Sequence, residues 1–152
     1  MSGSATCTRK SEPGTRIVFA SLRLSGDRLQ PDKVTEILQA APTVAYRKGE
    51  VYKRSRGNEA RGRTGLWLVS SEGRIESADL NDHLDYLLTL LFLDSGERLR
   101  RLHSLMRDQD IRADVSCFWY GEPGARPPVI RQDIRERLAL LPAPIELDFD
   151  TD

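Results

Sequence analysis

The 152-residue sequence has few cysteines and histidines, two of each. Cys7 lies in a polar N-terminal segment and Cys117 in an apolar run, so we expect reduced thiols rather than a disulfide. The N-terminus lacks the apolar core of a secretory signal, and no window approaches the roughly 18 apolar residues of a membrane span. These absences predict a soluble cytoplasmic protein without a membrane partner.

Signatures of catalysis and of metal binding are also missing. Asp79, Asp82 and His83 cluster where a helix is predicted to begin, but acidic residues there are explained by the helix dipole, and the ligand set is incomplete. His103 has no close histidine or cysteine neighbour, and Cys117 is predicted to pack in the core. No nucleophile elbow, phosphate-binding loop or dinucleotide-binding turn occurs. We therefore expect no catalytic residue, metal or cofactor, and favour a protein that is not an enzyme.

An excess of charge of one sign is absent as well, because 23 basic side chains balance 23 acidic ones. This balance argues against a nucleic-acid-binding domain, which usually carries a net basic charge. Locally, however, residues 47–63 (RKGEVYKRSRGNEARGR) contain seven basic and two acidic side chains. We predict an exposed loop here. Binding of phosphate groups is the alternative, with Tyr46 and Tyr52 available to stack on bases.

The apolar residues that are present recur with periods typical of strands and helices. Strand patterns occupy residues 17–26, 64–71, 113–121 and 145–150, with a weak one at 42–48, and helical patterns occupy 31–41, 80–93, 99–106 and 130–141. The order predicts the α+β class: a mixed or mainly antiparallel sheet of about five strands, helices packed on one face, related to the split βαβ (ferredoxin-like) arrangement. Residues 1–15 are predicted to be disordered, and 16–152 to form a single domain.

One face of this sheet is predicted to stay open. If the apolar residues Val18 to Leu24 at alternate positions face the helices, then Phe19 and Arg23 face away. Phe118 and Tyr120 share that outward side on a later strand, while the facing of Trp67 is not fixed by the sequence. Aromatic side chains mixed with arginine and carboxylates are typical of protein interfaces. The alternative is that another segment or a second copy covers this face.

Four segments carry a resemblance to a known family. GDRLQPDKVTEILQAAPTVAYRKGE, GLWLVSS, LNDHLDYLLTLL and IELDFD together resemble the bacterial family called domain of unknown function 4279, over nearly the whole chain after Thr15. Its most specific pieces are Gly26-Asp27 with Pro31, Pro42-Thr43 with Arg47-Lys48-Gly49, and Gly65 with Trp67. The resemblance implies the fold but no activity. Some relatives look like members of toxin–immunity neighbourhoods, which implies a binding role by association.

Two kinds of function follow as hypotheses. The first is a non-catalytic protein-interaction module, including an immunity-type inhibitor, which binds another protein or a second copy through the open face; the acidic strand residues Glu146, Asp148 and Asp150 would suit a basic partner. The second is a small-ligand or phosphate site around the basic insert. Nucleic-acid binding is a weaker alternative. The candidate binding residues are Thr43, Arg47, Lys48, Trp67, Phe19, Arg23, Phe118 and Tyr120.

Overall fold

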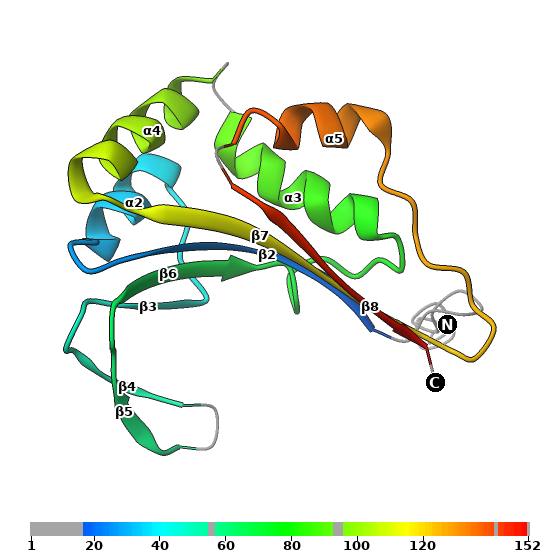
Figure 1. The fold of residues 1–152 in the computed structure, drawn as a ribbon, viewed down its shortest axis with the longest axis horizontal. Helices are drawn as coiled ribbons and strands as arrows, with labels where there is room; N and C mark the ends of the chain where they lie inside the picture. Colours follow the sequence, from blue (N-terminus) through cyan, green and yellow to red (C-terminus); the bar gives the residue numbers. More distant parts are fainter. Residues whose placement is uncertain (1–16, 55–56, 93–95, 142, 152) are drawn as a thin grey trace, which may run out of the picture.

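The computed structural model describes residues 17–54, 57–92, 96–141 and 143–151 (Figure 1). The predicted disordered segment 1–15 with Cys7, and Arg56 of the basic insert, lie outside the described residues. The elements in chain order are β2 (Ile17–Gly26), α2 (Pro31–Leu38), β3 (Val44–Tyr46), β4 (Val51–Lys53), β5 (Glu59–Arg61), β6 (Gly65–Ser70), α3 (Leu80–Phe92), α4 (Glu97–Gln109), β7 (Arg112–Gly121), α5 (Gln132–Leu138) and β8 (Ile145–Thr151).

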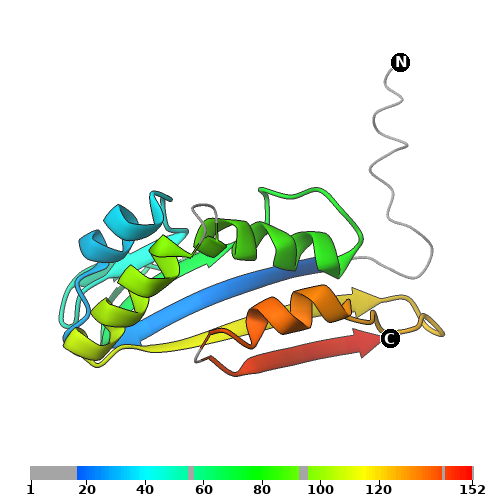
Figure 2. The same cartoon turned by 90° about the horizontal axis from the view of Figure 1, so that it is seen from above.

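Five strands form a mixed sheet in the order β3-β6-β2-β7-β8, in which only the β7–β8 pair is parallel. Helices α2 to α5 cover one face of this sheet (Figures 1 and 2). The predicted α+β class with helices on one face is confirmed. The predicted split βαβ arrangement is present in β2–α2–β3, because β2 and β3 are parallel and β6 lies between them. The further unit β7–α5–β8 is not split, because its two parallel strands pair directly.

The helix-facing residues of β2 and β7 explain why these two strands are the centre of the fold. Ala20, Leu22 and Leu24 of β2 are at most 1% exposed, and Val115 and Cys117 of β7 lie beside them in the antiparallel register. Strict alternation along β7 buries every second side chain. The leucines of α3 complete this core from above. The facing predicted from alternation is therefore confirmed for both strands.

Helix α2 begins at Pro31, as predicted, but ends at Leu38 rather than at the residues before Pro42. Gln39 takes a left-handed conformation with φ 52°, and the buried Arg98 of α4 donates hydrogen bonds to the carbonyl oxygens of Leu38 and Leu90 at 2.8 and 3.2 Å. Carbonyl groups at helix ends lack partners within the helix. Arg98 therefore joins the C-terminal ends of α2 and α3.

Most described residues of the basic insert are exposed, as predicted, but part of the insert forms strands rather than a loop. Strands β4 and β5 pair in a two-stranded ribbon, which extends from the sheet on the side away from the helices (Figure 1). Tyr52 of the ribbon stacks on Tyr46 of β3, with ring centroids 4.1 Å apart and planes at 7°. A Cβ at Gly62 would lie 2.6 Å from a Tyr46 ring carbon, so this contact needs a glycine. The stacked rings of Tyr46 and Tyr52 thus hold the polar ribbon against β3. A single pair of rings produces no apolar periodicity in the sequence.

Among the described residues, no helix combines the length and the apolar character that crossing a membrane requires.

Candidate protein-binding surface

The sheet face opposite the helices, called here the open face, carries an aromatic cluster (Phe19, Phe118 and Tyr120). The register places Phe19 of β2 directly opposite Phe118 of β7, and their rings stack with centroids 5.1 Å apart. Ile17 lies opposite Tyr120 in the next cross-strand pair and is 48% exposed. Such a cross-strand aromatic pair stabilises the sheet by about 0.2–1 kcal/mol and also presents apolar area to solvent. The cluster therefore offers a partly exposed apolar surface.

An acidic row (Glu146, Asp148 and Asp150) borders the aromatic cluster on β8. The parallel register sets Asp148 beside Phe118 and Asp150 beside Tyr120, so the three carboxylates lie on the open face. All three residues are exposed, and within the described part of the chain no ion pair engages them. Unpaired carboxylates make the local electrostatic potential negative and attract positively charged groups. This edge of the open face is therefore negative.

Further along β2 and β7 from the aromatic cluster, the open face carries paired charge and small polar side chains. Arg23 of β2 donates from Nε and Nη2 to Oδ2 of Asp114 on β7, at 3.1 and 2.9 Å. Ser21 lies between Ser70 and Ser116 in the register. The guanidinium is about half exposed and already neutralised by its partner. Arg23 therefore positions β2 against β7 and contributes little free charge.

Trp67 and Thr43, two of the candidate binding residues, each make a hydrogen bond within the fold, although Trp67 is buried and Thr43 is exposed. Trp67 is 0% exposed on the helix side of β6, and its Nε1–H donates to Oγ1 of Thr35 in α2 at 3.0 Å. Thr43 Oγ1 accepts a hydrogen bond from the Ser70 amide at 3.0 Å. Neither residue lies near the aromatic cluster. Their contacts hold α2 and the chain before β3 against β6.

Arg47 and Lys48 lie where β3 meets the ribbon, and each has a carboxylate opposite. Lys48 Nζ is 3.2 Å from Oδ2 of Asp27, and Arg47 is 3.7 Å from Asp32. Hydrogen bonds from Thr64 and then from Lys48 keep the pKa of the Asp27 carboxyl below its usual value. Exposed pairs of this kind contribute little to stability. They do reduce the net positive charge available to an anion.

The remaining specific pieces of the resemblance also have structural roles. Gly65 pairs with Gly26 across the β2–β6 ladder, and a Cβ at Gly65 would lie 2.8 Å from the Gly26 carbonyl oxygen. A Cβ at Gly26 would lie 2.9 Å from the Asp110 carbonyl oxygen. Such distances are too short for any side chain, so both positions need glycine. The family motifs thus account for how the strands and α2 pack, and the aromatic cluster lies outside them.

The structure brings Ser71 and His83 together as a buried pair, which no pattern in the sequence predicts. Ser71 Oγ lies 2.7 Å from Nδ1 of His83, accepts the Ala20 amide at 2.9 Å, and is 0% exposed. His83 Nε2 lies 2.8 Å from the Ser77 carbonyl oxygen. Because that carbonyl only accepts, Nε2 carries the proton and Nδ1 accepts from the hydroxyl. With both ring nitrogens engaged and no access for a substrate, the pair is a structural network.

The cluster noted in the sequence at the start of α3 consists of Asp79, Asp82 and His83. Asp79 Oδ1 accepts from the Asn81 amide, and Asp82 accepts from Ser77 Oγ, while His83 points inward to Ser71. The three side chains therefore do not converge on one point. Over the described residues, no three histidine, cysteine or acidic side chains are grouped closely enough to hold a metal ion.

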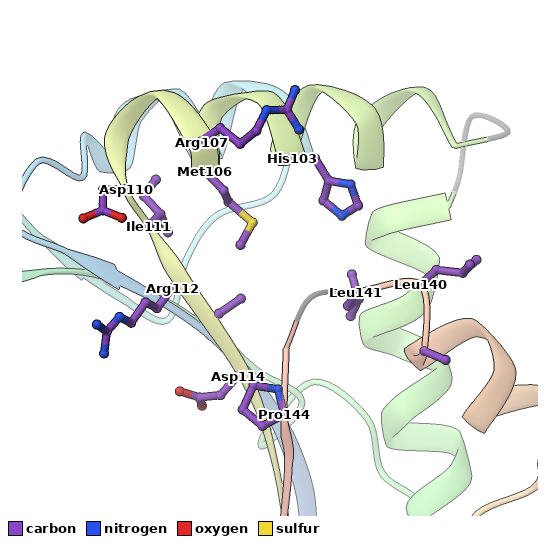
Figure 3. Close-up of a pocket in the computed structure, with 12 residues that line it drawn as sticks. His103, Met106, Arg107, Asp110, Ile111, Arg112, Asp114, Leu140, Leu141 and Pro144 are labelled. Atoms are coloured by element: carbon purple, nitrogen blue, oxygen red, sulfur yellow. The ribbon is translucent and has the colours of Figure 1, made fainter.

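A cleft of about 840 Å³ lies between the C-terminal half of α4, the start of β7 and the linker that follows α5. Figure 3 shows His103 and Met106 of α4 and Leu141 of the linker pointing into this space. His103 Nε2 is buried there without a hydrogen-bond partner among the described residues. None of the candidate binding residues lines the cleft. Its walls come from three separate segments, which no sequence motif connects.

Cys117 lies in β7 with its side chain in the core on the helix side of the sheet; it is 1% exposed, and burial raises the pKa of its thiol to about 11. A thiol that stays protonated at neutral pH is a poor nucleophile. The sequence interpretation of Cys117 as a core residue agrees with this position.

Fold and surface together define the class: a small α+β protein with a mixed five-stranded sheet, one covered face and one open face. The model of the family described as domain of unknown function (DUF4279) matches residues 15–152, so the chain belongs to that family. No curated protein and no solved structure matches the chain.

Proposed function

We propose that this protein is a non-catalytic binding module whose open face docks on another protein with a basic surface. The observation that carries the proposal is the adjacency of the aromatic cluster and the acidic row. Phe118 is the register partner of both Phe19 and Asp148, so apolar contact and negative charge occupy neighbouring strands. Interfaces combine a central aromatic anchor with a charged rim in this way.

The dimensions of the open face suit a protein interface at the small end of the usual range. Its strands of 3, 6, 10, 10 and 7 residues, at about 3.3 Å per residue and about 4.8 Å apart, span about 570 Å². An interface of standard size takes about 800 Å² from each partner, and a biological interface buries at least about 1,000 Å² in total. An immunity-type inhibitor, which binds a toxic protein partner, is the narrower form of this proposal.

The alternative of a phosphate site at Arg47 and Lys48 receives less support. Each cation already lies opposite a carboxylate, and neither lines the cleft. An incoming phosphate would have to displace Asp27 or Asp32 at an exposed site, where electrostatic gains are small.

The proposal is tested by affinity capture of the tagged protein at low salt from its native cells, with native mass spectrometry of what it carries. Asp148→Lys reverses one charge of the acidic row, and Glu36→Lys makes the same change on the exposed side of α2. We expect one stoichiometric protein on the wild type and on Glu36→Lys, but not on Asp148→Lys. A partner that Asp148→Lys retains in full, or a bound small molecule in place of a protein, would overturn the proposal.

A further inference from the structure

We infer that the partner adds an extended strand to the outer edge of β8, with basic side chains at alternate positions on the open-face side and apolar ones between them. This inference rests on the proposed function and names its mode of binding. Strand β8 is seven residues long, contains no proline, and is the last strand in the sheet order. In Figure 2 it runs along the outer margin of the molecule.

The β7–β8 ladder fixes which backbone groups of β8 are free. The Val115 amide donates to the Pro144 carbonyl oxygen at 3.0 Å, and Val115 pairs with Ile145 in the parallel register. In a parallel ladder the backbone groups alternate in direction along each strand. Glu146 and Asp148 therefore direct their amides to β7. Leu147 and Phe149 direct theirs outward, where the described part of the chain supplies no further strand.

The side chains along this edge specify what kind of strand fits. The acidic row lies on the open face, whereas Ile145, Leu147 and Phe149 lie on the helix side. Phe149 is held edge-on against Trp119, with ring centroids 6.1 Å apart, while Leu147 is 51% exposed. An added strand continues both faces of the sheet, so its side chains alternate between the carboxylates and the uncovered Leu147. In a strand of lysine or arginine alternating with apolar residues, the basic side chains would face the acidic row and the apolar ones would cover Leu147.

A second copy of β8 is a poor occupant of the same edge. Antiparallel pairing of two copies would continue the open face and bring the acidic row of one copy beside that of the other. Parallel pairing through the same edge would turn the second copy over and place its carboxylates beside the apolar Leu147. Like charges directly opposite each other destabilise a sheet, and charged side chains are a common protection of edge strands. The acidic row thus disfavours self-pairing and selects a strand of opposite charge.

The test uses the full chain and a capped synthetic peptide of alternating lysine and valine, with a glutamate–valine peptide as the charge control. Amide exchange is followed residue by residue by NMR. We expect the lysine peptide to slow exchange at Leu147 and Phe149 by about tenfold or more, with little change at Glu146 and Asp148, whose amides are already bonded to β7. The glutamate peptide should have no effect. Absence of protection at Leu147 and Phe149 with saturating lysine peptide would overturn the inference.

A proline variant separates strand addition from docking on the face. Leu147→Pro removes an outward amide and leaves the β7 ladder intact, since proline is accepted on an edge strand where its nitrogen faces solvent. Leu147→Ala controls for the lost side chain. We expect Leu147→Pro to weaken binding of the peptide and of the captured partner at least about tenfold beyond Leu147→Ala. If Leu147→Pro binds the partner as well as Leu147→Ala does, while Asp148→Lys does not bind, strand addition is wrong and docking on the open face stands.

Discussion

Removing the Ser71 hydroxyl tests whether the serine–histidine pair holds the fold together. In Ser71→Ala, two buried groups lose their partner: the Ala20 amide and Nδ1 of His83. A buried polar group left unsatisfied costs about 1–3 kcal/mol, so we expect a loss of about 2–4 kcal/mol, allowing for partial relaxation. That is a large share of the 5–15 kcal/mol typical of a domain.

The assay is urea unfolding with linear extrapolation, on the wild type, Ser71→Ala, His83→Phe and the double variant. Because the two side chains contact each other, we expect their effects to be non-additive by about 0.5–3 kcal/mol. A loss below about 0.5 kcal/mol for Ser71→Ala, or strictly additive effects, would refute the network. A serine-directed fluorophosphonate should leave folded protein unlabelled, because Ser71 is fully buried. Labelling of Ser71 in the folded protein would contradict its structural role.

Three further predictions concern the core, the motifs and the surface. Folding raises the pKa of the Cys117 thiol from its ordinary 9.0 to about 11. The free energy of unfolding should therefore be unaffected by this thiol below pH 9 and fall by about 2–3 kcal/mol as the pH rises towards 11. Denaturation curves of Cys117→Ala should lack this part of the alkaline loss. Gly65→Ala should destabilise the fold by at least about 1–3 kcal/mol because its methyl group meets the Gly26 backbone, and a melting temperature equal to that of the wild type would argue against the packing described. Asp148→Lys should change the unfolding free energy by less than about 0.5 kcal/mol, which calorimetry can check, because the exposed carboxylate has no partner among the described residues.

Alternation of apolar and polar residues was enough to predict both faces of β2 and β7. A one-residue slip would expose Leu22 or Val115, so burial fixes the register strongly. The placement of Phe118 between Phe19 and Asp148 follows once the strands are paired. The sequence was therefore sufficient to predict most of the side chains on the open face.

Features that depend on contacts between distant segments were not accessible in this way. Trp67 occupies a short strand with apolar residues on both faces, and its burial and its hydrogen bond to Thr35 show which face it takes. The Tyr46–Tyr52 stack holds the ribbon β4–β5 against β3, and the ribbon has no apolar stripe. Hydrophobic periodicity therefore predicted a loop in this segment. Ser71 follows β6 and His83 lies in α3, so the two meet only through the tertiary fold. Contacts of this kind, between residues far apart in the chain, leave no pattern in the local sequence that could predict them.

The role of the acidic row in binding is measured by the affinity of the captured partner for the wild type, Asp148→Lys and Glu36→Lys over a range of salt concentrations. We expect wild-type binding to weaken as salt rises, since exposed complementary charges are screened. Asp148→Lys should bind at least about tenfold more weakly and with a smaller salt dependence, whereas Glu36→Lys should match the wild type within about twofold. Equal affinities for all three proteins, or binding that salt does not affect, would contradict a role for the acidic row and the open face.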